Sequence, residues 1–307
     1  MDIIVLKISN RKGVFFTAMA IIIISLLVAS YTFYSYVQER KVIQKRIETM
    51  NNFILSIEND LTRKMFISGF RAIFVFNNKI IDTGSYISNV TQGFQELFFN
   101  GTFLGQQQQV MNGAKFSDIA NDFNFQGNKI NINVSITNSS VSIAQMDPWN
   151  VNVTLIAYLL IKDKNNLASW NKTIVSSELI PIYHFEDPVY LLNTGGIITT
   201  KINQTSYSSF TPENLLNHTQ NQYYIQSTDA PSFLDRLEGK INADSQFGIE
   251  SLVNTPRLST QGINVLDKSI VDHIYFSLTN PPYCQVAGMP TWFKLDTASL
   301  SRYNVNC

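Results

Sequence analysis

The stretch Val14–Tyr36, VFFTAMAIIIISLLVASYTFYSY, contains no charged residue and decides how the rest of the chain is arranged. Basic residues precede it at Arg11 and Lys12, and the charged run Glu39-Arg40-Lys41 follows it. As a helix rising about 1.5 Å per residue it spans roughly 34 Å, enough to cross a hydrocarbon core of about 30 Å. It therefore predicts a single-pass transmembrane helix in a cell membrane, with residues 1–13 as a cytoplasmic leader and the C-terminal part outside the cell.

The composition is polar but weakly charged. The 307 residues include 23 Lys and Arg and 23 Asp and Glu, which gives a formal net charge of +0. This balance argues against a broadly basic surface that would bind nucleic acid. Charged residues make up only 15% of the chain, whereas amides and hydroxyls are frequent, a composition that suits an extracellular protein.

Three interpretations of the apolar stretch remain open at the sequence level. It is a retained signal-anchor, or a cleaved secretory signal with small residues at Val28-Ala29-Ser30, or a pilin-type leader cut just before the apolar helix. Basic residues flank both ends, so the positive-inside rule does not decide the orientation. The long polar region that follows favours a C-terminal part outside the cell.

The motif Arg11-Lys12-Gly13, followed directly by an unbroken apolar helix, resembles the class III signal of archaeal type IV pilins and pilin-like surface proteins, here an uncharacterised subgroup. In that family a membrane peptidase cuts after the glycine, so the resemblance implies cleavage between Gly13 and Val14 and packing of the helix with other pilin-like subunits. The resemblance covers residues 7–60. Bacterial pilins carry a glutamate at the fifth mature position, where this chain has Ala18, and this departure argues against a bacterial major pilin.

Residues 37–125 predict a helical stalk and a helical layer. Gln38–Ser68 lacks Gly and Pro and is rich in helix formers. Its apolar residues recur at alternating spacings of four and three, which places them on one stripe of a helix. The stripe consists of Ile43, Ile47, Met50, Ile54, Ile57 and Leu61. It packs either on the chain's own head or on other subunits in a filament or coiled coil. The helical pattern loosens after Gly69. A short helix or an irregular segment is expected at Asn89–Phe99, and another short helix at Lys115–Phe125.

Apolar and polar residues alternate from Lys129 onward, which is typical of half-buried strands. Long strands are expected around a turn at Asn138-Ser139-Ser140, and a nearly apolar run at Leu155–Ile161 indicates burial on both faces. Further strands are expected at 170–180, 189–192, 197–202, 249–253 and 270–278, and a short helix at Ser232–Gly239. Residues 129–307 thus predict an extracellular β-rich domain, with a sub-boundary near 206–221. The predicted fold class is α+β: a transmembrane helix continuing into an amphipathic helical stalk, then an antiparallel β-sandwich-like head.

Two kinds of covalent feature are expected outside the cell. Cys284 and Cys307 are the only cysteines, and in an oxidising compartment a disulfide between them contributes about 3 kcal/mol by the chain-entropy model. The alternative is two free thiols. Eight N-glycosylation sequons follow the apolar stretch and none precedes it. The acceptors are Asn89, Asn100, Asn133, Asn138, Asn152, Asn171, Asn203 and Asn217.

The search for catalytic patterns is mostly negative. The chain has no CxxC, HExxH, GxSxG, Walker or dinucleotide motif, and its three histidines share no ligand spacing, so no metal or cofactor is expected. His184, Glu186 and Asp187 cluster before Pro188, either as an acid/base group or as a turn with solvated carboxylates. Arg236 lies among acidic residues, where local ion pairs at a helix N-terminus are the expected explanation.

These patterns favour a non-enzymatic, membrane-anchored surface glycoprotein that acts in surface assembly or adhesion. Its expected partners are the lipid membrane, other pilin-like subunits, and surface glycans or cells, but not nucleic acid. One alternative is a signal-anchored extracellular hydrolase or glycan-binding protein with a divergent site around Glu186 and Asp187. Another is a structural subunit of a membrane complex.

Overall fold

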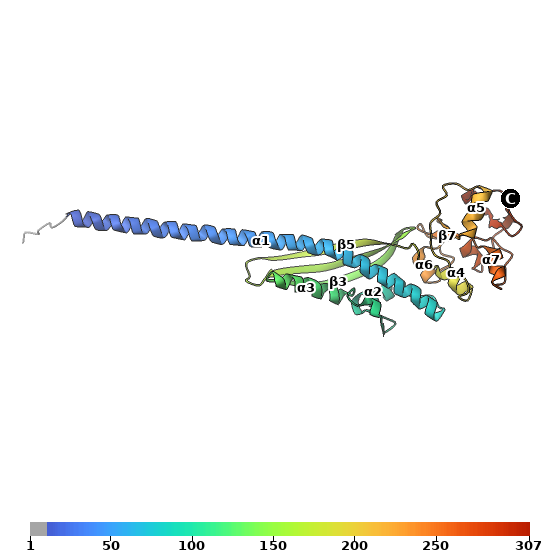
Figure 1. Ribbon diagram of the computed structural model, residues 1–307, viewed down its shortest axis with the longest axis horizontal. Helices are drawn as coiled ribbons and strands as arrows, with labels where there is room; N and C mark the ends of the chain where they lie inside the picture. Colours follow the sequence, from blue (N-terminus) through green and yellow to red (C-terminus); the bar gives the residue numbers. More distant parts are fainter. Residues whose placement is uncertain (1–10) are drawn as a thin grey trace, which may run out of the picture.

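The computed structural model describes residues 11–307, and one helix dominates it. Helix α1 (Arg11–Thr83) is 73 residues long. Its first half projects as a free rod, and its second half runs along the head (Figure 1). The helix stops where Gly84 adopts a positive φ of 63°, while the Gly84 N–H still bonds to the carbonyl of Ile80 at 2.9 Å.

The helix does not loosen at Gly69, contrary to the prediction. Gly69 faces the sheet, and a Cβ atom there would lie 2.9 Å from the side chain of Ile180 and 3.0 Å from that of Val153. The glycine is therefore a point of close helix–sheet packing, and the cost of about 1 kcal/mol relative to Ala in a helix is offset by that contact.

Two further helices complete the helical layer. They are α2 (Val90–Asn100), which Asn89 caps by accepting from the Gln92 N–H, and α3 (Phe116–Lys129). Both confirm the helices expected from the sequence. Between them lie a small hairpin, β1 (Thr102–Phe103) and β2 (Gln106–Gln107), and a 3₁₀ turn, η1 (Gln109–Met111).

A three-stranded antiparallel meander forms the second layer. Its strands are β3 (Ile132–Asp147), β4 (Asn150–Asp163) and β5 (Ser169–Pro181), in the order β3-β4-β5. The turn predicted at Asn138-Ser139-Ser140 is instead a shift of register within β3, between Thr137 and Ser140. Residues 132–147 therefore form one long strand with a bulge, because the partner β4 continues past this point.

The core lies between this sheet and the helices. Alternate residues of β4 from Val151 to Ile161 are buried, and they face α1, whereas α2 and α3 pack on β3 (Figure 1). The opposite face of the sheet is open: Ile156 is 44% exposed, and its neighbours Tyr158 and Leu160 are only half-buried. The structure does not confirm the predicted sandwich. Within residues 11–307, helices and not a second sheet cover the inner face, and the remaining sheets are two-stranded.

The rest of the chain is irregular and lies at the end of the head farthest from the rod (Figure 1). Its helices are α4 (Pro188–Asn193), α5 (Pro212–Gln220), α6 (Phe233–Leu237), α7 (Thr255–Thr260), α8 (Asp272–Tyr275) and α9 (Thr297–Arg302). Its strands are β6 (Tyr224–Gln226), β7 (Ile249–Ser251), β8 (Tyr283–Gln285) and β9 (Lys294–Asp296). The chain as described is therefore α+β.

Two of the strands expected in this part are helical instead, and 197–202 forms only an isolated bridge between Lys201 and Glu186. Residues 189–192 are helical because Asp187 caps the Val189 N–H and Pro188 occupies the first helical position. Residues 272–275 are helical, and the carboxylate of Asp272 is held by buried partners that are distant in sequence. The helix predicted at Ser232–Gly239 is confirmed as α6, with Ser232 as its cap.

Candidate functional site

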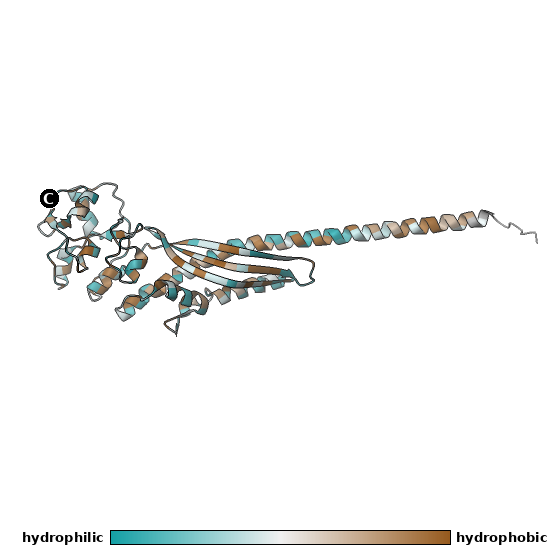
Figure 2. Cartoon of the chain, turned by 180° about the vertical axis from the view of Figure 1, so that it is seen from behind, coloured by the Kyte–Doolittle hydropathy of each residue, from teal (hydrophilic) through white to brown (hydrophobic). Residues whose placement is uncertain are grey.

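The free half of α1 is the first candidate site. Among the described residues, α1 is the one helix long and apolar enough to span a membrane. Its apolar side chains lie fully on the surface, as for Phe15 at 67% exposed and Tyr31 at 73%. Figure 2 shows this end of the rod as mostly hydrophobic, followed by a more polar section before the head. So large an apolar surface needs an external apolar environment.

Only the last residues of the predicted leader lie within the described part of the chain. Residues 1–10 of the predicted leader are outside the described residues, and the predicted cleavage point, Gly13 and Val14, falls in the first turn of α1. Nothing in the fold of the head depends on this turn, because the head first contacts α1 much later in the helix.

The structure divides the predicted apolar stripe between two environments. Met50, Ile54, Ile57 and Leu61 are buried in the head, at 7% exposure or less. Ile43 lies one turn before Arg46, Ile47 lies directly after it, and the two remain 38% and 39% exposed. The first of the two sequence interpretations, packing on the chain's own head, thus describes the later part of the stripe, whereas Ile43 and Ile47 keep apolar surface exposed to solvent.

The point where α1 enters the head is fixed by a buried ion pair. Arg46 Nε lies 2.5 Å from Asp163 Oδ1, and Arg46 also donates to the backbone carbonyls of Ile130 and Asn131. Burial by itself would raise the pKa of Asp163, but the hydrogen bonds from Arg46 and from two backbone N–H groups hold that pKa below its ordinary value. The sequence analysis did not single out this pair, because its members are 117 residues apart.

The second candidate site is a cavity of about 280 Å³ between the later turns of α1 and the segment after β5. Its walls are Phe70, Phe74, Ile81, Tyr183 and Phe185, joined by the polar residues Asn77, Asn78, His184, Glu186 and Lys201. We call it the α1–β5 cavity. Two members of the predicted acid/base cluster, His184 and Glu186, therefore line one hollow.

The third member of that cluster lies elsewhere. The side chain of Asp187 is completely buried, where it accepts from Arg236 at 2.6 Å and from the Tyr224 hydroxyl at 2.7 Å. Burial raises the pKa of Asp187, and the charge of Arg236 opposes this rise. The structure thus separates Asp187, which is buried against Arg236, from Glu186, which lines the α1–β5 cavity.

Arg236 is the centre of a buried charge cluster. Its guanidinium contacts Asp187, Asp272 at 3.0 Å, and the carbonyl of Ile249, and all three charged side chains are inaccessible to solvent. Burial favours the neutral form of Arg236, but the two carboxylates outweigh it and raise its pKa above the ordinary value. The ion pairs predicted for Arg236 within its own helix are wrong: Asp235 instead bonds to Ser232 in the helix cap.

A second acidic group is buried nearby. Glu250 is inaccessible to solvent, and Arg302 donates to both of its carboxylate oxygens at 2.9 and 2.7 Å. Burial would raise the pKa of Glu250, yet His273 and Arg302 lower it. Arg302 also pairs with Asp229 on the surface. In residues 11–307 no group of three or more His, Cys, Asp or Glu side chains has the geometry of a metal site.

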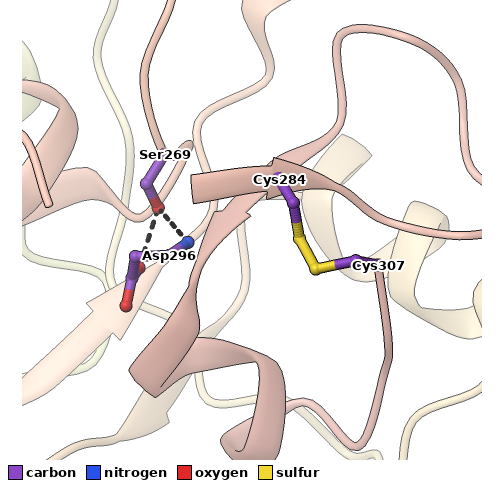
Figure 3. Close-up of a disulfide and its surroundings, with 4 residues drawn as sticks. All are labelled: Ser269, Cys284, Asp296 and Cys307. Atoms are coloured by element: carbon purple, nitrogen blue, oxygen red, sulfur yellow. Dashed lines mark hydrogen bonds between the residues drawn. A yellow bond between two sulfur atoms is a disulfide. The ribbon is translucent and has the colours of Figure 1, made fainter. Parts of the chain in front are cut away.

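A disulfide joins the C-terminal residue covalently to β8. Cys284 and Cys307 form a disulfide with a Cα–Cα distance of 5.7 Å (Figure 3). Beside it, Ser269 donates to Asp296 at 2.9 Å and accepts from the Asp296 backbone N–H. These contacts tie β8, β9 and the C-terminus into one unit.

The sequon asparagines all lie at the surface. Each of the eight is exposed or half-buried. Asn133, Asn152 and Asn171 lie on the open face of the sheet, as their register shows: Asn133 is opposite Lys162, and Asn171 is opposite Leu160. Access by a modifying enzyme is therefore not blocked by burial at any of them.

Comparisons of the chain with protein-family models, with curated proteins and with solved structures returned no match.

Proposed function

We propose that this chain is a non-enzymatic, membrane-anchored cell-surface glycoprotein with a pilin-like architecture that acts in surface assembly or adhesion. The observation that carries the proposal is the division of one continuous helix. The first half of α1 exposes its apolar side chains on all sides, and the second half is the spine of a folded head.

A lipid bilayer, or the apolar core of a filament, is the environment that suits the first half. Residues 14–36 span roughly 34 Å, close to the hydrocarbon thickness of about 30 Å. Burial of this surface is favourable at about 25 cal/mol for each Å² removed from water. In a soluble protein, the same helix would leave this apolar surface exposed to water.

The features of the head support a location outside the cell. The disulfide between Cys284 and Cys307 is typical of an oxidising compartment. All eight sequons are on the head side of the apolar stretch, and their acceptors are accessible. These observations favour an orientation with the head outside the cell and a short leader in the cytoplasm.

Assembly with other subunits is supported by the exposed start of the stripe. Ile43 and Ile47 lie at the point where α1 enters the head, on the same stripe as the buried Met50, and they remain more exposed than Met50. A second copy that is anchored in the same membrane would bring its own α1 alongside at this level. The resemblance of Arg11–Tyr36 to pilin signals is the reason to propose a pilin-like subunit and not a monomeric anchor.

Vesicle flotation tests the anchor. The purified full-length chain, mixed with phosphatidylcholine vesicles as detergent is removed, should float with the vesicles. The double variant Ile23→Arg, Leu27→Arg should stay in the soluble fraction or aggregate, because each charge at mid-bilayer costs about 3 kcal/mol. The matched control, Leu55→Arg with Ile81→Arg, changes two α1 residues of similar exposure in the head and should float. Equal flotation of both variants would contradict the proposal.

A further inference from the structure

We propose that the α1–β5 cavity binds a single hexose unit of a surface glycan. The inference rests on the proposed location at the cell surface, where glycans are presented. It assigns the head a ligand class and a site, and makes adhesion the more specific form of the proposed function.

The walls of the cavity are aromatic. Phe70 and Phe74 lie one turn apart on α1 and remain 42% and 41% exposed, although both are large apolar side chains. Phe185 packs against Phe70, with ring centroids 5.3 Å apart, and Tyr183 stacks on Trp149 at 6.0 Å. Aromatic faces of this kind are held in place by their neighbours and present flat apolar surfaces that suit the C–H face of a sugar ring.

Polar groups at the rim lack partners. Over residues 11–307, the side chains of His184, Glu186 and Lys201 make no hydrogen bond and no ion pair, and each lines the cavity. They offer a carboxylate acceptor, an ammonium donor and an imidazole that both donates and accepts. A few convergent polar groups beside apolar walls are the usual composition of a small-molecule site.

The segment that carries these groups is rigid. The N–H of His184 bonds to the carbonyl of Ile202, that of Ile202 to the carbonyl of Phe185, and that of Asp187 to the carbonyl of Thr200. From the other side, Asn77 of α1 donates to the carbonyl of Glu186 at 3.0 Å. His184 itself adopts a φ of 68°, a conformation that non-glycine residues rarely accept and that is frequent at functional sites.

Size and position favour a small, one-ring ligand. A hollow of about 280 Å³ is just below the range of drug-sized pockets, roughly 300–1,000 Å³, so it suits a one-ring ligand. Phe70 lies about 50 Å along α1 from the end of the apolar segment, which places the cavity out of reach of lipid headgroups. One lysine beside one glutamate does not favour a phosphate-rich ligand.

Binding is measured on the full-length chain, held in a detergent without a sugar headgroup. The probes are methyl α-mannoside, methyl α-glucoside, methyl α-galactoside and N-acetylglucosamine, followed by saturation-transfer NMR. At least one should bind with a Kd of about 1 mM, the affinity expected for so small a ligand. Phe74→Ala and Glu186→Gln should each weaken binding about tenfold, since they remove the stacking face and a charged acceptor.

The control is Phe125→Ala, which removes an exposed aromatic (60%) of α3 outside the cavity lining. It should bind the sugar as the unchanged chain does. Absence of binding by every probe, or equal loss in the Phe125 and Phe74 variants, would overturn the proposal. The vesicle flotation is independent of this measurement, so a failed anchor and a failed sugar site give different results.

Discussion

Arg46 Nε lies 2.5 Å from Asp163 Oδ1, and this contact joins the stalk to the turn between β4 and β5. The side chain of Asp163 is inaccessible to solvent, and that of Arg46 is 19% exposed. Among the described residues, the apolar side chains of α1 before Arg46 are exposed or half-buried, whereas Met50, Ile54, Ile57 and Leu61 after it are buried in the core. The pair therefore marks the boundary between the free and the packed halves of α1.

Replacement of Arg46 should destabilise the head. Arg46→Ala leaves a buried carboxylate without its charged donor, which costs roughly 2 kcal/mol in the free energy of unfolding. Chemical denaturation followed by circular dichroism measures this change. Arg40→Ala, one and a half turns earlier on the exposed helix, is the control, and its effect should stay below about 0.5 kcal/mol. Equal stabilities of the two variants would contradict the role given to Arg46.

The two parts of the apolar stripe should respond differently to a charge. Ile54 is 7% exposed, so Ile54→Asp places a carboxylate in the core and should unfold the head or cost more than about 3 kcal/mol. Ile47 is 39% exposed, so Ile47→Asp should leave the thermal unfolding of the head nearly unchanged. If Ile47 packs on other subunits, the same variant should lose assembly, measured by electron microscopy or sedimentation. Intact assemblies would refute that contact.

Arg236 should be among the most sensitive residues of the head. Arg236→Met leaves Asp187 and Asp272 buried together without a cation, which costs about 3–5 kcal/mol. The triple variant that also carries Asp187→Asn and Asp272→Asn should recover part of the loss, because no buried charge then remains. Arg63→Met breaks only a surface pair with Asp60 and should cost less than about 1 kcal/mol. Unfolding of the three variants in denaturant decides between these outcomes.

His218 should make the head sensitive to mild acid. Burial among Phe210, Tyr223 and Tyr303 lowers the pKa of His218 from 6.5 to about 4, with Glu250 acting weakly in the opposite direction. Because the folded pKa is below the unfolded one, the unfolded chain binds the proton first. Stability is therefore full above pH 6.5 and is lost as the pH falls towards about 4, by roughly 3 kcal/mol.

The test compares unfolding free energies at about pH 7 and about pH 4.5 for the unchanged chain and for His218→Gln. The variant should show a much smaller difference between the two conditions, whatever its stability at neutral pH. Asp163 and Glu250, whose pKa values are lowered, affect stability only at still lower pH. An unchanged pH dependence in the variant would show that His218 is not the group responsible.

Local sequence patterns predicted the helices and strands whose buried faces are set by residues close in the chain. The apolar stretch, the stripe from Met50 to Leu61, and the alternation through β4 each follow from one periodic contact surface. The short helix after Ser232 was visible in the same way. The predicted sandwich is not confirmed, and an apolar run such as Leu155–Ile161 does not show whether its second face is covered.

The long-range contacts were beyond the reach of sequence patterns. Arg46 with Asp163, and Arg236 with Asp187 and Asp272, are separated by 117, 49 and 36 residues. The His184-Glu186-Asp187 cluster marked two residues of the cavity, but its pattern did not show that Asp187 is buried against Arg236. The sequence pattern predicted that the helix loosens after Gly69, so Phe70 and Phe74 were not recognised as residues of one continuous helix.

The most direct test of the account is the mass and N-terminal sequence of the chain purified from membranes of its native host. The account predicts a mature chain that starts at Val14 and keeps the whole apolar segment as the anchor of the head. A chain that keeps Met1 would retain the anchor but contradict the pilin-like processing. A chain that starts near Tyr31 would have lost the segment, and this result would contradict the central claim that the free half of α1 holds the head at a membrane.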